Sequence, residues 1–221
     1  MPIYCDESGG VGRGIMTMGA IYISEEKAAA ILQRFRDVTG RKGELKGSRI
    51  DLAERALIME MIAASRAPAV ISIALSVTRT PEGEARGTHD IAIYAALMDD
   101  AVGALLPLTN ACGSVWMDAG RYGAPVLEKV RRNIAEIAGP WNVSQLEESD
   151  RLAGLQLADV IANSFFNRAR VSGKQARIAA AVQPMLESGQ FDMRILGEED
   201  VDPFEMPPAA SKPAAQALAK D

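Results

Sequence analysis

The opening stretch of the chain, residues 3–10 (IYCDESGG), joins a short apolar strand to two acids and a pair of glycines. A strand in a protein core normally carries apolar side chains, and a buried carboxylate costs free energy unless another group pairs with it. A carboxylate at a strand end, next to flexible backbone, is typical of a position that holds a metal ion or a catalytic group. Asp6 is therefore the first candidate site residue.

A glycine-rich loop, residues 9–14 (GGVGRG), separates this strand from a second predicted strand at residues 15–23. The two strands should form a hairpin. The glycines do not indicate a phosphate-binding loop, because no Gly-Lys-Ser/Thr follows them and the next element is a strand rather than a helix.

The order of the later elements indicates the fold class. Ser24 and Asp51 should cap two helices, the first of which should end at Gly40, and Thr88 should cap a long helix. Helices are predicted at about 25–39, 52–65, 88–106, 123–138, 152–168 and 174–186, and strands at 70–77, 113–117 and 141–146. An antiparallel start followed by alternating strands and helices predicts an α/β fold with a mixed β-sheet flanked by α-helices.

Length and composition favour one domain. A chain of 221 residues that is 48% hydrophobic can bury one sizeable core, and we assign it to residues 1–196. From residue 197 onward the composition turns acidic and then rich in proline and alanine, so residues 197–221 should form a flexible tail.

Charge and cysteine content limit the possible partners and the cellular compartment. A net charge of -5 gives no general attraction to nucleic acid or anionic lipid, so a nucleic-acid contact needs a local basic patch or a cation. Cys5 and Cys112 are expected to be small buried hydrophobic residues in a reducing compartment. No secretory signal is recognisable, and no apolar run approaches the roughly 20 residues of a membrane span. We expect a cytoplasmic protein with no membrane partner; a homodimer or a protein partner stays open.

Three acids share a context that suggests one site. Asp6 and Asp118 follow predicted strands, and Asp159 lies in an otherwise apolar helix, with Gln156 and Asn163 at helical spacing on a narrow polar stripe. Three oxygen donors with room for water suit Mg²⁺ or Mn²⁺ rather than zinc. Each acid also has a structural alternative: Asp159 could be solvated, Asp118 could cap a turn, and Asp6 could pair with an arginine.

A fourth element is Glu44-Leu45-Lys46, in which the two charged side chains should point to the same side of an extended segment. Glu44 could complete a metal shell and Lys46 could hold a phosphate oxygen; the alternative is a solvated basic loop. Glu7 should alternate to the other face from Asp6 and is a weaker candidate, and Ser8 could donate a supporting hydrogen bond.

Other chemistries have little support. His89 is the single histidine, which disfavours zinc sites and histidine-based nucleophilic catalysis, and no G-x-S-x-G motif occurs. We expect His89 to be an exposed residue in the first turn of its helix, with a role in the site as the alternative.

The motifs D-E-S-G at 6–9, E-L-K at 44–46, an acid after a strand at 118, and L-Q-L-A-D at 155–159 resemble the family called domain of unknown function 3800. The similarity spans roughly residues 1–170. It implies a ribonuclease H-like fold and an acidic metal site in which Asp6, Glu44, Asp118 and Asp159 are metal ligands with Lys46 beside them. The polar run before the last motif is short here, so Asp150 could compete with Asp118 or Asp159 for a site role.

These features favour a nuclease that uses Mg²⁺ or Mn²⁺ to hydrolyse phosphodiester bonds of DNA or RNA by a two-metal mechanism. Lys46, with Arg41 or Lys42, would offset the charge of the nucleic-acid backbone. Two alternatives stay open: a catalytically silent module that binds a protein partner, and a phosphohydrolase that acts on small phosphates.

Overall fold

A mixed β-sheet forms the centre of the computed structural model, which describes residues 1–75, 86–109 and 112–197. Within those residues the sheet has six strands in the order β5-β4-β1-β2-β3-β6. The strands are β1 (Ile3–Gly10), β2 (Ile15–Tyr22), β3 (Ala69–Leu75), β4 (Ser114–Asp118), β5 (Val143–Glu147) and β6 (Phe191–Leu196). β2 is antiparallel to both its neighbours, and the other pairs are parallel.

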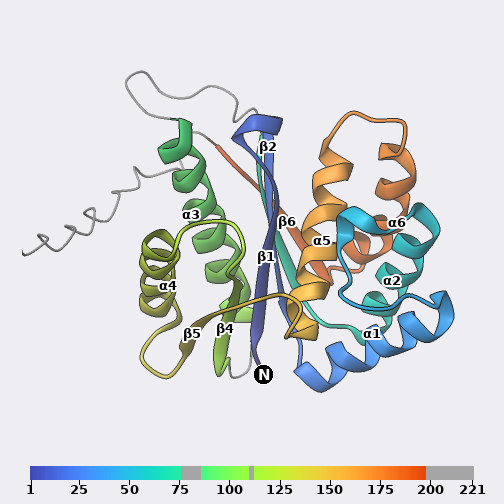
Figure 1. The fold of residues 1–221 in the computed structure, drawn as a ribbon, viewed down its shortest axis with the longest axis horizontal. Coiled ribbons are helices and arrows are strands. Elements are labelled where there is room, and N and C mark those ends of the chain that lie inside the picture. Colours follow the sequence, from blue (N-terminus) through green and yellow to red (C-terminus); the bar gives the residue numbers. More distant parts are fainter. Residues whose placement is uncertain (76–85, 110–111, 198–221) are drawn as a thin grey trace, which may run out of the picture.

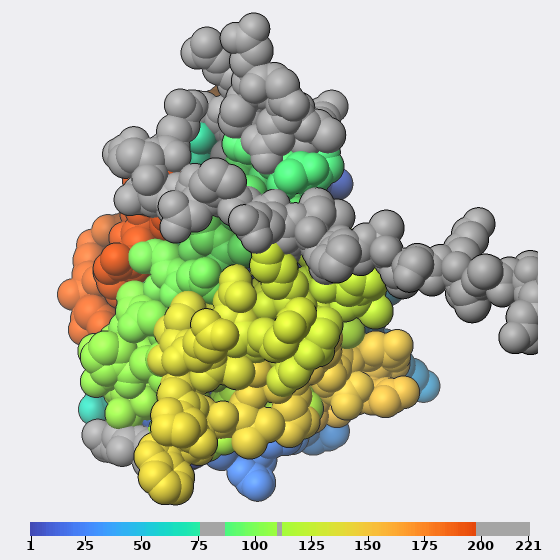
Figure 2. All heavy atoms as spheres, turned by 90° about the vertical axis from the view of Figure 1, so that its left-hand side faces the viewer, coloured from blue at the N-terminus to red at the C-terminus, as the bar shows by residue number. Residues whose placement is uncertain are grey.

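Helices cover both faces of the sheet (Figure 1). One face carries α3 (Arg86–Leu105) and α4 (Ala124–Ala138), and Figure 2 looks onto their outer surface. The other face carries α1 (Glu25–Thr39), α2 (Leu52–Ser65), α5 (Ala153–Ala169) and α6 (Gln175–Glu187). Short 3₁₀ turns occur at η1 (Val11–Arg13), η2 (Gly47–Arg49) and η3 (Leu106–Leu108). The predicted α/β class, a mixed sheet flanked by helices, is confirmed.

Alternation along β1 decides which face each side chain meets. Ile3 and Cys5 belong to the hydrophobic core under α3 and α4, whereas Tyr4 belongs to the core under α1, α2 and α5. Because side chains alternate along a strand, Asp6 faces the α5 side and Glu7 faces the α3 side. The predicted separation of these two acids is confirmed.

The local start and stop signals mostly act as predicted. The Ser24 hydroxyl accepts a hydrogen bond from the Lys27 amide, Asp51 forms a capping box with Glu54, and Gly40 ends α1 in the left-handed conformation. Thr88 does not cap α3, because the helix already begins at Arg86.

Two strand predictions also need correction. β1 does not end at its acids but continues to Gly10, because the hairpin with β2 stays paired to its tip. β6 was not predicted; it is a six-residue strand in which Asp192 and Arg194 interrupt the apolar residues. Of the predicted features, residues 76–77, most of the loop at 80–87 and the tail from 198 lie outside the described residues.

One helical stretch, Gly87–Leu108, is long and apolar enough to cross a membrane by length and composition, so the expectation that no such run exists is wrong. More than half of it is buried inside the protein. Its apolar residues, among them Leu97, Met98 and Val102, pack into the core above the sheet. A core position accounts for the composition of this helix.

Helix α5 lies very close to the sheet because small residues occur where the two meet. A Cβ atom added to Gly19 of β2 would come within 3.0 Å of the Ala162 nitrogen, and one added to Gly154 would come within 2.2 Å of the Tyr4 ring. Close approach at these two glycines brings the side chains of α5 down onto β1.

This packing predicts opposite effects for two helical Gly→Ala substitutions. Gly154→Ala should destabilise the protein by about 1–3 kcal/mol, because the new methyl group overlaps Tyr4. Gly103→Ala in α3 has no atom within 4 Å of the new group and should stabilise by up to about 1 kcal/mol through helix propensity. Urea unfolding of the two variants measures the difference, and equal effects would contradict the close packing of α5.

Candidate functional site

A row of acids crosses three neighbouring strands. Cys5 of β1 pairs with Met117 of β4, so Asp6 and Asp118 follow side by side, and Asp118 pairs with Glu147 of β5. Neighbouring strands lie about 4.8 Å apart, and paired residues in parallel strands point to the same face. The row therefore places three carboxylates on the face covered by α5.

Asp6 is the buried end of this row and is only 4% exposed. Its Oδ1 accepts a hydrogen bond from the Glu7 amide at 2.7 Å. Its Oδ2 is buried and has no hydrogen-bond partner within the described part of the chain. A buried carboxylate oxygen without a donor is costly, so this atom is suited to a proton or a cation.

Asp118 and Glu147 lie nearer to solvent. Asp118 Oδ2 accepts a hydrogen bond from the Gly120 amide at 3.2 Å, so the alternative role of capping the next turn is present in the structure. Glu147 forms an ion pair with Arg151 at 3.2 Å. Sequence reasoning missed Glu147; the register between β4 and β5, which brings it beside Asp118, is visible only in the folded sheet.

Asp159 reaches the same face from α5. Its Oδ2 accepts a hydrogen bond from the Gly47 amide at 2.6 Å. Gly47 fits tightly against α5, since a Cβ atom there would come within 2.7 Å of Asn163 Cβ. The backbone of the 44–47 segment thus orients Asp159.

Buried Arg55, 5% exposed, fixes this segment to α5 from behind. Its guanidinium donates to the Gly47 carbonyl at 2.5 Å, to Asn163 Oδ1 at 2.9 Å and to Ser164 Oγ at 2.7 Å. Burial lowers the pKa of Arg55, and the charge of Asp159 opposes that effect. No sequence pattern marked Arg55 as a support of the site.

The predicted polar stripe on α5 exists, but it is buried, which corrects the expectation that it faces solvent. Gln156 is 3% exposed and Asn163 is 7% exposed. Gln156 Oε1 accepts the Leu45 amide at 2.9 Å, and Asn163 Nδ2 donates to Ser8 Oγ at 3.1 Å. The stripe is the surface on which the 44–47 segment and the end of β1 are held.

Glu44 and Lys46 point to the same side, as predicted, and form an ion pair at 3.0 Å. Ser149 joins them: Lys46 Nζ lies 2.6 Å from Ser149 Oγ, which donates to Glu44 Oε1 at 2.5 Å. Burial alone would raise the pKa of Glu44, but the hydrogen bonds from Ser149 and Lys46 outweigh it and lower that pKa. This pair is half-buried rather than part of a solvated loop.

The acids and Lys46 act on one another electrostatically. Burial raises the pKa of Asp6 well above its usual value, the charges of Glu7, Asp159 and Asp118 raise it further, and Lys46 opposes them. Burial also raises the pKa of Asp159, against the Gly47 amide and Lys46.

Lys46 itself responds to these acids. Burial would lower its pKa, but the hydrogen bond to Glu44 and the charges of Asp6 and Asp159 raise it. The structure therefore brings the five predicted site residues into one electrostatic neighbourhood; their roles as ligands stay a prediction.

The donors are carboxylate oxygens, which suit a hard divalent cation. Over residues 1–75, 86–109 and 112–197, no group of three or more His, Cys, Asp or Glu side chains is already arranged to hold a metal ion. The buried, unpaired Oδ2 of Asp6 is the feature of this structure that a cation would satisfy. The residue types fit Mg²⁺ or Mn²⁺, but the side chains would have to move together to bind one.

A second polar cluster lies behind the site, on the α3 side. Arg121 contacts Glu7 at 3.5 Å and Asp90 at 3.1 Å, and the Tyr122 hydroxyl donates to Asp90 at 2.7 Å. Burial raises the pKa of Glu7 to about 7, although Arg121 lowers it. His89 lies in the first turn of α3 and is half-buried rather than exposed.

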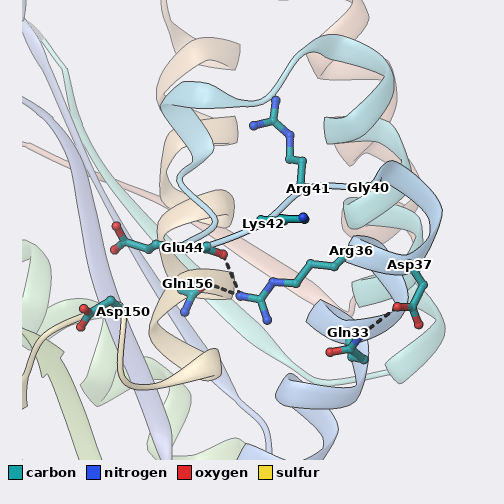
Figure 3. Close-up of a pocket in the computed structure, with 10 residues that line it drawn as sticks. Gln33, Arg36, Asp37, Gly40, Arg41, Lys42, Glu44, Asp150 and Gln156 are labelled. Atoms are coloured by element: carbon teal, nitrogen blue, oxygen red, sulfur yellow. Dashed lines mark hydrogen bonds between the residues drawn. The ribbon is translucent and has the colours of Figure 1, made fainter.

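A pocket of about 820 Å³ lies next to the site, between the end of α1, the 40–44 segment and the start of α5. We name it the Arg36 pocket. Figure 3 shows the Arg36 guanidinium directed toward Gln156, with the Glu44 carboxylate turned away from it. Its lining residues are Gln33, Arg36, Asp37, Gly40, Arg41, Lys42, Gly43, Glu44, Asp150 and Gln156. Asp150 thus belongs to this pocket, and it is exposed.

Comparison with known proteins adds little to this picture. No family model and no curated protein matches the chain. Among solved structures, the chain is similar to ribonuclease HII in the PCNA:RNase HII complex from Archaeoglobus fulgidus. The alignment has a TM-score of 0.46 and 16% identity, and it covers 86% of this chain and 77% of that chain. The resemblance to domain of unknown function 3800 therefore stays a prediction.

The raised pKa of Asp6 predicts a pH-dependent stability difference. The folded protein holds the Asp6 proton more tightly than the unfolded chain, so this group makes the protein less stable as the pH rises above the usual aspartate range. Asp6→Asn removes the titration. The unfolding free energy of Asp6→Asn relative to the unsubstituted protein should increase from pH 4 upward and level off above the raised pKa.

Urea unfolding across this pH range measures the trend. The matched control is Asp37→Asn, an exposed aspartate that accepts a hydrogen bond from Gln33. A constant offset between Asp6→Asn and the unsubstituted protein at all pH values would contradict the raised pKa.

The three hydrogen bonds of Arg55 predict a large effect of a conservative change. Arg55→Lys keeps the charge but cannot reproduce the fork to Ser164, Asn163 and the Gly47 carbonyl, so it should destabilise by about 3 kcal/mol. Arg34→Lys, an exposed position on α1, should change stability by less than about 0.5 kcal/mol. Similar unfolding midpoints for the two variants would refute this role.

Proposed function

We propose that the chain is a nuclease that depends on Mg²⁺ or Mn²⁺ and hydrolyses phosphodiester bonds of DNA or RNA. The observation that carries the proposal is the buried Oδ2 of Asp6, which has no hydrogen-bond partner in the described residues and faces the side that also presents Asp118 and Asp159. Mutually repelling carboxylates beside a lysine are a costly arrangement for a purely structural core.

Asp6, Asp118, Asp159 and Glu44 would hold the cations. When bound, two such ions would acidify an attacking water and stabilise the departing oxygen of the phosphodiester. Glu147 lies beside Asp118 in the acid row and is a further candidate to hold an ion.

The remaining residues keep these groups in place and add positive charge. Lys46, held by Glu44 and Ser149, presents its ammonium near the acids and would contact a phosphate oxygen. The Gly47 amide fixes one oxygen of Asp159, leaving the other for a cation. Arg55 holds Gly47 and Asn163, so it positions the site without touching the substrate.

Cleavage of labelled DNA and RNA strands with Mg²⁺ or Mn²⁺ tests the proposal. Asp6→Asn and Asp159→Asn should each lower the cleavage rate by more than about 100-fold, the upper range for residues that only support a metal ligand. Asp192→Asn, an exposed position on β6, is the matched control and should cleave normally.

Adjacent residues provide a second matched pair. Glu147→Gln should reduce cleavage because its side chain lies in the acid row, whereas the exposed Glu148→Gln should not. Cleavage that persists in both Asp6→Asn and Asp159→Asn would exclude this site.

Other outcomes identify the alternatives. Turnover of small phosphates without cleavage of strands would indicate a phosphohydrolase. Absence of cleavage, together with absence of cation binding at millimolar concentrations in calorimetry, would indicate a non-catalytic module.

A further inference from the structure

Two cations of the Arg36 pocket, Arg36 and Lys42, have no acid partner within the described part of the chain. Arg36 donates to the Gly43 carbonyl at 3.0 Å and to Gln156 Oε1 at 3.4 Å, both uncharged groups. Neither Arg36 nor the exposed Lys42 forms an ion pair with any acid among the residues that the structure describes. A half-buried guanidinium bonded to neutral acceptors keeps its attraction for an anion.

The third cation of the pocket is already engaged. Arg41 forms a two-pronged contact with Glu54, one arm at 2.6 Å, and also donates to the Arg49 carbonyl at 2.9 Å. Of the two alternatives that the sequence left open beside Lys46, Arg41 or Lys42, these contacts favour Lys42.

The acids of the pocket oppose an anion less than their number suggests. Glu44 turns toward Lys46 and Ser149, and Lys46 offsets its charge, whereas Asp37 accepts a hydrogen bond from the uncharged Gln33 at 2.7 Å and keeps its charge. Figure 3 shows Asp150 on the other side of Gln156 from Arg36. An anion would therefore bind at the end of the pocket formed by Arg36 and Lys42.

The pocket and the acid row are joined through α5. Gln156, which contacts Arg36, and Asp159, which belongs to the site, are three residues apart, about 4.5 Å along the helix axis. The 44–47 segment contacts both residues, through the Leu45 amide on Gln156 and the Gly47 amide on Asp159, and Glu44 is turned away from Arg36. A ligand with one phosphate offers a group for one of the two places, whereas the consecutive phosphates of a strand offer a group for each.

We propose that the Arg36 pocket binds the sugar–phosphate backbone of a nucleic-acid strand next to the bond that is cleaved, with Arg36 and Lys42 contacting phosphate. The proposal rests on the proposed function for the identity of the polymer. It assigns substrate binding to residues outside the acid row, and it explains how an acidic protein can hold a polyanion locally.

Fluorescence anisotropy with 12-nucleotide DNA and RNA strands in EDTA tests binding separately from cleavage. Arg36→Gln/Lys42→Gln should weaken strand binding about tenfold. It should also reduce the slope of log K against log salt by about 0.7 for each phosphate that the variant no longer neutralises. Arg34→Gln/Lys174→Gln removes the same charge from exposed positions that do not line the pocket, and should leave the slope unchanged.

Three results would overturn the inference: no binding of strands by the unsubstituted protein at low salt, equal losses in both double variants, or a mononucleotide that competes as well as a strand. Thermal unfolding checks that the variants fold; Lys42→Gln alone, at an exposed position, should still lower the slope. In a further outcome, Asp6→Asn and Asp159→Asn cleave normally while Arg36→Gln/Lys42→Gln loses strand binding. That result would reject the proposed catalytic role of the acids and would support strand binding by the Arg36 pocket.

Discussion

The rest of the site depends on one unfavourable placement, the carboxylate of Asp6 inside the protein on the α5 side of the sheet. Asp6 lies opposite Gly19 in the hairpin ladder, where α5 packs closely against the sheet, and its side chain has little access to water. Burial and three neighbouring acids raise its pKa, and the charge of Lys46 opposes them. The surrounding apolar core must offset this cost.

Helix α5 converts that placement into an organised site. Successive polar residues on its buried face hold the 44–47 segment: Gln156 binds the Leu45 amide, Asp159 binds the Gly47 amide, and Asn163 shares Arg55 with the Gly47 carbonyl. A segment without regular structure is thereby fixed by side chains of one rigid helix. The same helix borders the Arg36 pocket, so α5 positions both the acids and the side chains around Arg36 and Lys42.

The sequence predicts the elements whose signals are local. The hairpin, the caps at Ser24 and Asp51, and the end of α1 at Gly40 depend on neighbouring residues alone, and so does the alternation that separates Asp6 from Glu7. The missed features depend on distant pairing. Glu147 joins the acid row only through the β4–β5 register, and β6 gains its partner from β3 across more than 100 residues. Arg55 and the burial of Gln156 depend on a loop that covers them, which no periodicity reveals.

Raised carboxylate pKa values and an acidic composition together determine how such a site would bind a cation and then a nucleic-acid strand. A cation binds the ionised form of a carboxylate, so the raised pKa values of Asp6 and Asp159 would make cation affinity rise with pH until both groups are ionised. The cation would then supply positive charge where the net charge of the chain is -5. Arg36 and Lys42 would add their positive charge in the pocket next to the acids. Attraction of a strand would therefore have one component that depends on the bound cation and one that depends on these side chains and is screened by salt.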